Sequence, residues 1–222
     1  MASEPIHIKH WEESALKDSI CSIRLGSRGT IYRWKPRTVL KYSVDRHSFP
    51  QDTEHAEYAA EALKAAASLW NERKIGVQFK EVANHEPATF RLVYDHQQLQ
   101  DDLLANAFLP NEVQTGKPRL TVYPLAFCKE RDYYNYLTNV FCHELGHVLG
   151  LRHEFKESFD PSVRWGKENG SSVMNYFVHP SEFSIQRTDY KDLRRFYASK
   201  GTQYKGFSIV DVDPAYFVPP SE

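Results

Sequence analysis

Three closely spaced histidines constrain this chain more than any other feature. His143 and His147 stand four residues apart, and Gly150 and His153 follow. On a helix, residues four apart lie on the same face, so the two imidazoles can reach one metal ion. Gly150 can adopt a positive φ and end the helix in a sharp turn. His153 can then turn back toward the same ion, so the pattern predicts a helix that ends at a metal site.

The donor set indicates a catalytic zinc ion. Three neutral imidazole nitrogens suit zinc and leave its fourth tetrahedral position open to water. Glu144 lies about 100° around the helix from His143, so it can act on a bound water without being a ligand. A histidine pair of this kind can arise by chance, but the third histidine and the glycine at the required spacings favour the metal site. We predict one zinc ion bound by His143, His147 and His153.

These motifs resemble those of a known clan of proteins. Residues 143–153 resemble the metzincin signature. Residues 172–176, Ser-Val-Met-Asn-Tyr, resemble the methionine-containing turn of astacins and serralysins, in which a tyrosine follows the methionine by two positions. Glu154, which follows the third histidine, also resembles astacins, whereas residues 104–110 are more similar to matrixins. The chain therefore resembles a metzincin of mixed features, without a subfamily.

The resemblance implies an α+β fold of the metzincin zincin type. Its upper lobe would hold a twisted, mostly parallel but mixed sheet with two backing helices. Its lower lobe would be rich in loops and contain a C-terminal helix. It further implies a zinc-dependent endopeptidase that acts on peptides or proteins, with Glu144 as general base and Tyr176 as a hydrogen-bond donor to the oxyanion. Met174 would support the metal site from beneath without contacting the metal.

A second function is compatible with the same motifs. The chain could be an interaction or effector protein with the metzincin fold that binds zinc but cleaves little, because a fold does not by itself establish an activity. The intact Glu144 argues against this alternative, since degenerate relatives of proteases commonly lose that residue first.

The hydrophobic pattern agrees with the implied order of elements. We expect residues 1–35 to be an irregular N-terminal extension and residues 36–222 to form the catalytic domain, with the lobes at about 36–150 and 151–222. Strands are expected at 39–44, 77–82, 90–94 and 120–123, and the last of them is our candidate for the edge strand that binds substrate. Helices are expected from a cap at Thr53 to near Gly76, from a cap at Asp132 to about Leu149, and at about 188–198.

Composition excludes several classes of partner. A net charge of −1 and a pI near 6.8 give no electrostatic reason to expect binding to nucleic acid or to an anionic membrane. The sequence contains no apolar run long enough to span a bilayer, and we expect a monomer. The first 20 residues lack the apolar stretch of a secretory signal. We therefore expect a cytoplasmic protein, or a secreted one whose signal has been removed.

The cysteines and one further histidine leave alternatives open. Cys21, Cys128 and Cys142 are too few for a disulfide framework. Cys142 is expected to be a small buried residue, although a bridge to Cys128 is possible. The surroundings of Cys21 do not match the matrixin pro-segment motif, so we do not expect it to confer latency. His179, after the methionine turn, is either a surface residue or part of the wall of a substrate pocket.

Overall fold

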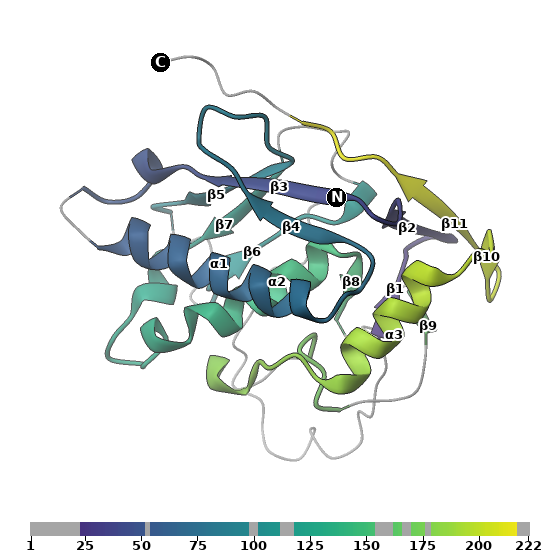
Figure 1. Cartoon of the computed structure of the whole chain (residues 1–222). Coiled ribbons are helices and arrows are strands. Elements are labelled where there is room, and N and C mark those ends of the chain that lie inside the picture. The colour runs from purple at the N-terminus through teal and green to yellow at the C-terminus, as the bar shows by residue number, and fades with distance from the viewer. Residues whose placement is uncertain are drawn as a thin grey trace.

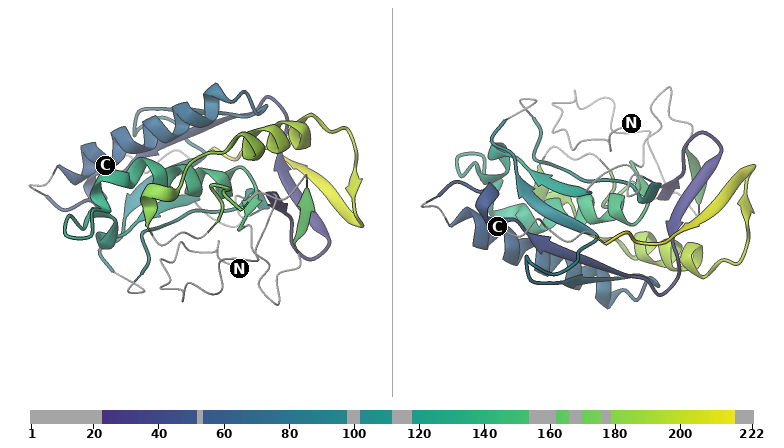
Figure 2. Two further views of the ribbon diagram at one scale, coloured as in Figure 1. Left: turned by 90° about the horizontal axis from the view of Figure 1, so that it is seen from below. Right: turned by 90° about the horizontal axis from the view of Figure 1, so that it is seen from above.

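The computed structural model describes residues 23–51, 54–97, 102–111, 118–153, 162–165, 170–175 and 179–216. Within these residues the chain forms a five-stranded sheet, two three-stranded sheets and three α-helices. Figures 1 and 2 show the five-stranded sheet with two helices along one face, and the third helix beside the smaller sheets. The expected α+β architecture with a mixed sheet is confirmed.

The five-stranded sheet has the order β4-β3-β5-β7-β6. Its strands are β3 (Val39–Val44), β4 (Gln78–Glu81), β5 (Phe90–Tyr94), β6 (Ala105–Asn106) and β7 (Arg119–Val122). Strands β3, β4, β5 and β7 are parallel to one another, and β6 pairs antiparallel with β7. The four expected strands are therefore present, with ends that differ by one residue at most. The strand at 77–82 was predictable from its alternation of apolar and polar residues, and the other three from their β-branched and aromatic residues.

The assignment of residues 120–123 to the sheet edge is wrong. β7 pairs with β5 on one side and with β6 on the other, so it lies inside the sheet. Among the described strands, β6 pairs with β7 alone and forms the edge on this side of the sheet, and β4 forms the other edge. A strand of two residues carries too little hydrophobic pattern to be recognised, which is why the sequence did not indicate it.

Two helices back the sheet, α1 (His55–Glu72) and α2 (Leu137–Val148), and they pack against each other. The buried face of α1 contains five alanines together with Leu63 and Trp70. Small side chains let the two helix backbones come close. The indole N–H of Trp70 donates to the carbonyl of Cys142 at 3.0 Å and fixes α1 against the middle of α2.

The two expected helix caps have different outcomes. Thr53 lies outside the described residues. Asp132 does not cap α2, because it has a φ of 58° and its carboxylate accepts a hydrogen bond from the Asn135 side chain. A turn of 3-10 helix, Tyr134–Tyr136, follows it, and α2 begins only at Leu137. A local turn therefore uses the aspartate that the sequence suggested as a cap.

The remaining elements gather at one end of the sheet. They are β1 (Ile23–Leu25), β2 (Thr30–Trp34), β8 (Leu151–Arg152), β9 (Val163–Trp165), α3 (Arg187–Ala198), β10 (Gln203–Tyr204) and β11 (Phe207–Val212). They form sheets of order β8-β1-β9 and β10-β11-β2, and α3 lies beside them (Figure 1). Short 3-10 helices occur at Arg46–Ser48, Pro124–Phe127 and Pro180–Glu182.

The expectation of irregular structure before residue 36 is wrong for residues 23–34. β1 pairs with two strands that follow α2, and β2 pairs in parallel with β11 near the C-terminus. Such pairings depend on residues far apart in sequence, which local periodicity does not reveal. The division of the chain at residue 35 remains a prediction. None of the helices in the described part of the chain is long and apolar enough to cross a bilayer.

Candidate metal centre and active site

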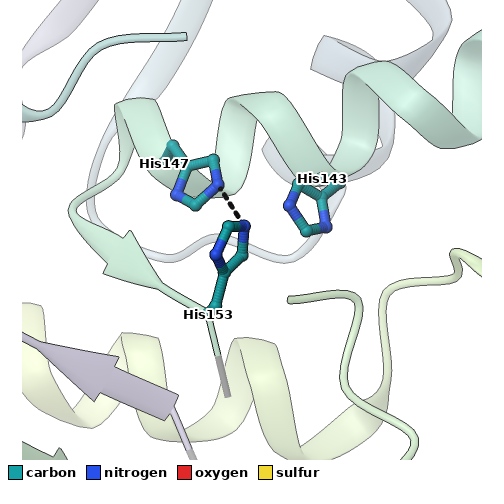
Figure 3. Close-up of side chains that lie close together, drawn as sticks. All are labelled: His143, His147 and His153. Atoms are coloured by element: carbon teal, nitrogen blue, oxygen red, sulfur yellow. Dashed lines mark hydrogen bonds between the residues drawn. The ribbon is translucent and has the colours of Figure 1, made fainter. Parts of the chain in front are cut away.

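The second half of α2 carries His143 and His147 into the interior, where both side chains are buried. α2 ends at Val148, and the chain turns at Gly150, which has a φ of 90° and whose N–H donates to the carbonyl of His147 at 2.8 Å. The two residues of β8 then lead directly to His153, which is also buried. Figure 3 shows the three imidazoles turned toward one another, two from the helix and one from the returning chain.

The separations of the imidazole nitrogens suit a tetrahedral metal ion. The possible ligand atoms of His143, His147 and His153 all lie within 4.8 Å of one another. The Nε2 atoms of His147 and His153 are 3.2 Å apart. Zinc–nitrogen bonds of about 2.0–2.1 Å at tetrahedral angles place two ligand nitrogens about 3.3–3.4 Å apart. The sequence-predicted ligands are therefore brought together at a spacing that a zinc ion could bridge.

Backbone carbonyls fix the orientation of the two helical histidines. Nδ1 of His143 lies 2.7 Å from the carbonyl oxygen of Val173, and Nδ1 of His147 lies 2.9 Å from that of Leu151. A carbonyl can only accept, so each Nδ1 carries the proton and donates it. Each Nε2 is then left with a lone pair, as in metal-binding histidines whose other nitrogen is held by a carbonyl.

His143 provides the clearest evidence that the residues fit a metal. Its side chain is fully buried, and its Nε2 has no hydrogen-bond partner among the described residues. Burial lowers the pKa of His143 well below its usual value, and the neighbouring His147 and His153 lower it further. The imidazole is therefore neutral at neutral pH, which is the form that binds a metal ion.

Glu144 is the one acidic group beside the histidines in α2, and it is fully buried. Burial raises the pKa of its carboxyl well above the usual value. The backbone N–H of Ala107, directly after β6, lies near enough to lower that pKa in part. Neither carboxylate oxygen makes a hydrogen bond of normal geometry within the part of the chain that the structure describes. A buried carboxyl group that makes no hydrogen bond of normal geometry is typical of a functional group rather than a structural one.

The methionine turn packs beneath the helix, where we expected it. Met174 is fully buried, and its Sδ occupies the space that a Cβ atom on Gly146 would need. The preceding residue, Val173, supplies the carbonyl that orients His143. The turn thus fixes the metal-site helix through one packing contact and one hydrogen bond.

Asp189 in α3 holds this turn and was not among the predicted site residues. One oxygen of its buried carboxylate accepts hydrogen bonds from the N–H of Val173 at 3.0 Å and from the N–H of Gln186 at 2.8 Å. Gln186 and Asp189 form a capping box at the start of α3. Gln-x-x-Asp differs from the usual Ser/Thr-x-x-Glu/Gln pattern of a capping box, so the sequence indicated neither this cap nor its contact with the turn.

The other candidates are three residues outside the described part of the chain and two cysteines within it. Tyr176, Glu154 and Cys21 lie outside the described residues. Cys128 and Cys142 are free thiols, so the possible bridge between them is not formed. Burial raises the pKa of the Cys142 thiol to about 12, which agrees with an inert buried residue.

His179 does not join the three-histidine centre. Its Nδ1 accepts from the N–H of Ser181 at the start of a 3-10 helix, so its Nε2 donates to the carbonyl of Arg131 at 3.1 Å. Its ring also lies near those of Tyr133 and Tyr136. These contacts place His179 beside the loop that precedes α2. Its contribution to a substrate pocket remains a prediction.

The fold, the three converging histidines and the methionine turn together define a metzincin. Comparison with protein families identifies the branch: the matrixin family matches residues 33–198, which is three quarters of the chain. The chain belongs to the matrixin family, whose members are zinc-dependent metallopeptidases. A search of curated proteins gave no match. The mixed features of the sequence are thus resolved in favour of the matrixin side.

The close packing of Met174 against Gly146 can be tested by substitution. We expect Gly146→Ala to lower the free energy of unfolding by about 1–3 kcal/mol, because the added methyl overpacks the site against Sδ. In a Met174→Ala background the same substitution should instead be stabilising, because alanine favours a helix over glycine by about 1 kcal/mol. Urea unfolding of the four proteins measures this reversal. Equal effects in both backgrounds would contradict the proposed contact.

Proposed function

We propose that this matrixin is a zinc-dependent endopeptidase in which His143, His147 and His153 bind one catalytic zinc ion and Glu144 is the general base. One observation carries the proposal. A neutral histidine nitrogen without a partner among the described residues converges with two other buried imidazoles, and a buried carboxyl group without a normal hydrogen bond follows in the next residue. Such an arrangement is costly unless a cation and a water complete it.

In the proposed mechanism, the zinc ion and Glu144 have different roles. When bound, a zinc ion of this kind polarises the scissile carbonyl and lowers the pKa of a water molecule toward neutrality. Glu144 accepts the proton of that water and later transfers it to the leaving amine. Burial raises the pKa of its carboxyl, so Glu144 takes up a proton more readily than an exposed glutamate, which supports a role in proton transfer.

The sheet edge supports the assignment of a peptide substrate. β6 is the edge strand on the side of β7, and the N–H of Ala107, directly after β6, is close to the Glu144 carboxylate. An extended peptide that pairs with this edge is held by its main-chain groups. Pairing of this kind needs neither terminus of the substrate, so it favours cleavage within a chain. We therefore infer that substrates bind along β6.

The zinc stoichiometry is the first prediction for this function. We expect one zinc ion per wild-type chain, and a large loss of affinity in His153→Ala, because each of the three imidazoles supplies one bond. Elemental analysis and competition with a chromophoric chelator measure both quantities. His179→Ala is the matched control, because His179 contacts Arg131 and Ser181 rather than the centre. Wild-type protein that binds no zinc, or His153→Ala protein that binds it normally, would contradict the ligand assignment.

The second prediction separates catalysis from binding. We expect Glu144→Gln to retain zinc and the fold and to lose about 10²–10⁴ in kcat, the range that general acid–base catalysis supplies. Steady-state cleavage of a peptide library, with zinc content measured on the same samples, checks this. A variant that cleaves at a tenth of the wild-type rate would show that Glu144 is not the base. Wild-type protein that binds zinc but cleaves no peptide would favour the alternative of a binding or effector protein.

The third prediction concerns Tyr176. We propose that its hydroxyl donates to the oxyanion of the tetrahedral intermediate, so Tyr176→Phe should lower kcat with little change in KM. Loss of a single oxyanion donor costs about 10²–10³ in kcat in another hydrolase. We expect a smaller factor here, because Tyr176 would not be the only group that stabilises this charge. Unchanged kcat in steady-state kinetics would assign the tyrosine to the packing of the turn.

A further inference from the structure

The short segment that joins α2 to His153 is anchored at almost every residue. The indole N–H of Trp34 donates to the carbonyl of Val148 at 2.7 Å, and the Tyr197 hydroxyl donates to that of Leu149 at 3.0 Å. Both donors and both acceptors are buried. These two bonds satisfy carbonyls at the end of the helix that have no partner within it. They fix where the helix ends, but both carbonyls precede the turn at Gly150, so they do not hold the residues after it.

After Gly150 the chain depends on a different partner. β8 consists of Leu151 and Arg152 alone and is an edge of the sheet β8-β1-β9. Its strand neighbour is β1, with Leu25 opposite Leu151 and residue 24 opposite residue 152. The next residue is His153. The N-terminal strand is thus paired with the two residues that immediately precede the third proposed zinc ligand.

Besides this pairing, a hydrogen bond from Nδ1 of His147 to the Leu151 carbonyl, 2.9 Å, also holds the segment. A strand of two residues has no stability of its own, and the glycine before it has the widest choice of backbone conformations. β1, in contrast, is held firmly. It is the central strand, paired with β9 on its other side, and Leu25 is fully buried in the core.

A residue of β2 also packs against the turn at Gly150. The carbonyl oxygen of Tyr32 in β2 lies 3.1 Å from the position of a Cβ on Gly150. A tight bridge between Ser27 and Thr30 connects β1 to β2. β1 and most of β2 precede residue 33, where the match to the matrixin family begins. This support for the turn is therefore a feature of the chain outside the matched region.

We propose that β1, residues 23–25, is a positioning element for the zinc ligand His153: by pairing with β8 it holds the His153 imidazole where His143 and His147 converge. Residues 23–34 are then a functional part of the metal centre and not a removable extension. The inference rests on the proposed function, because it takes His153 to be a zinc ligand. It assigns the backbone of β1 a role in metal affinity and no chemical step.

The test breaks the backbone pairing in the full-length chain. Proline lacks an N–H and disrupts a central strand, so Arg24→Pro should disrupt the pairing of β1, whereas Arg24→Ala keeps the N–H and is the matched control. We expect Arg24→Pro to weaken zinc binding about 10–100-fold, the loss seen when groups that orient metal ligands are removed. The affinity of Arg24→Ala should stay close to that of the wild type. Chelator competition gives the affinities, and circular dichroism confirms that each variant is folded.

A double-mutant cycle distinguishes positioning from a general loss of stability. In a His153→Ala background, Arg24→Pro should weaken zinc binding little further, because the ligand that β1 positions is already missing. An equal further loss in that background would overturn the proposal. So would wild-type affinity in folded Arg24→Pro protein. If Arg24→Pro does not fold, Leu25→Ala, which keeps the backbone and removes a buried anchor, is taken through the same cycle with the same expectations.

The same measurements separate this inference from the function on which it rests. Wild-type protein that binds no zinc would overturn the proposed function, and the positioning role with it. Wild-type protein that binds zinc through His153, together with unchanged binding in the strand variants, would overturn the positioning role alone.

Discussion

Burial of polar groups that lack ordinary partners is the constraint on which this structure depends. His143 and Glu144 are fully inside the protein, and an unsatisfied buried group costs about 1–3 kcal/mol. One nitrogen of His143 is satisfied by the Val173 carbonyl, and the other points to the place where His147 and His153 converge. An arrangement of this kind is costly unless the surrounding chain holds the groups rigidly and a cation completes it, as we propose. Contacts from several parts of the fold hold the helix that carries these groups.

The rigidity comes from hydrogen bonds that link distant parts of the chain. The His143 imidazole donates to Val173, and the N–H of Val173 donates to Asp189 at the start of α3. The metal-site helix is thus connected through the methionine turn to the third helix. At its other end, Trp34 and Tyr197 hold the last carbonyls of α2. A substitution in α3 or near residue 34 can therefore disturb the centre without contacting it.

The sequence alone predicted where the three histidines converge and the main framework. Ligand spacing on a helix is set by local geometry, so the positions of His143, His147 and Glu144 on one helix, and the turn at Gly150, followed from the motif. The parallel strands and their two backing helices followed from residue periodicity and composition. The packing of Met174 beneath the helix followed from the resemblance to metzincins. All these features depend on a short window of sequence or on one recognisable motif.

Tertiary structure alone decided which segments support the site. The pairing of β1 with β8, the parallel pairing of β2 with β11 and the edge position of β6 join short strands that have little pattern of their own. The role of Asp189 likewise depends on a hydrogen bond to a turn 16 residues away. Such contacts are selected by the packing of the whole chain, whose free energy is not encoded in any local stretch. The sequence therefore determined which side chains converge, whereas long-range pairing determined which strands lie beside the segment that leads to the third histidine.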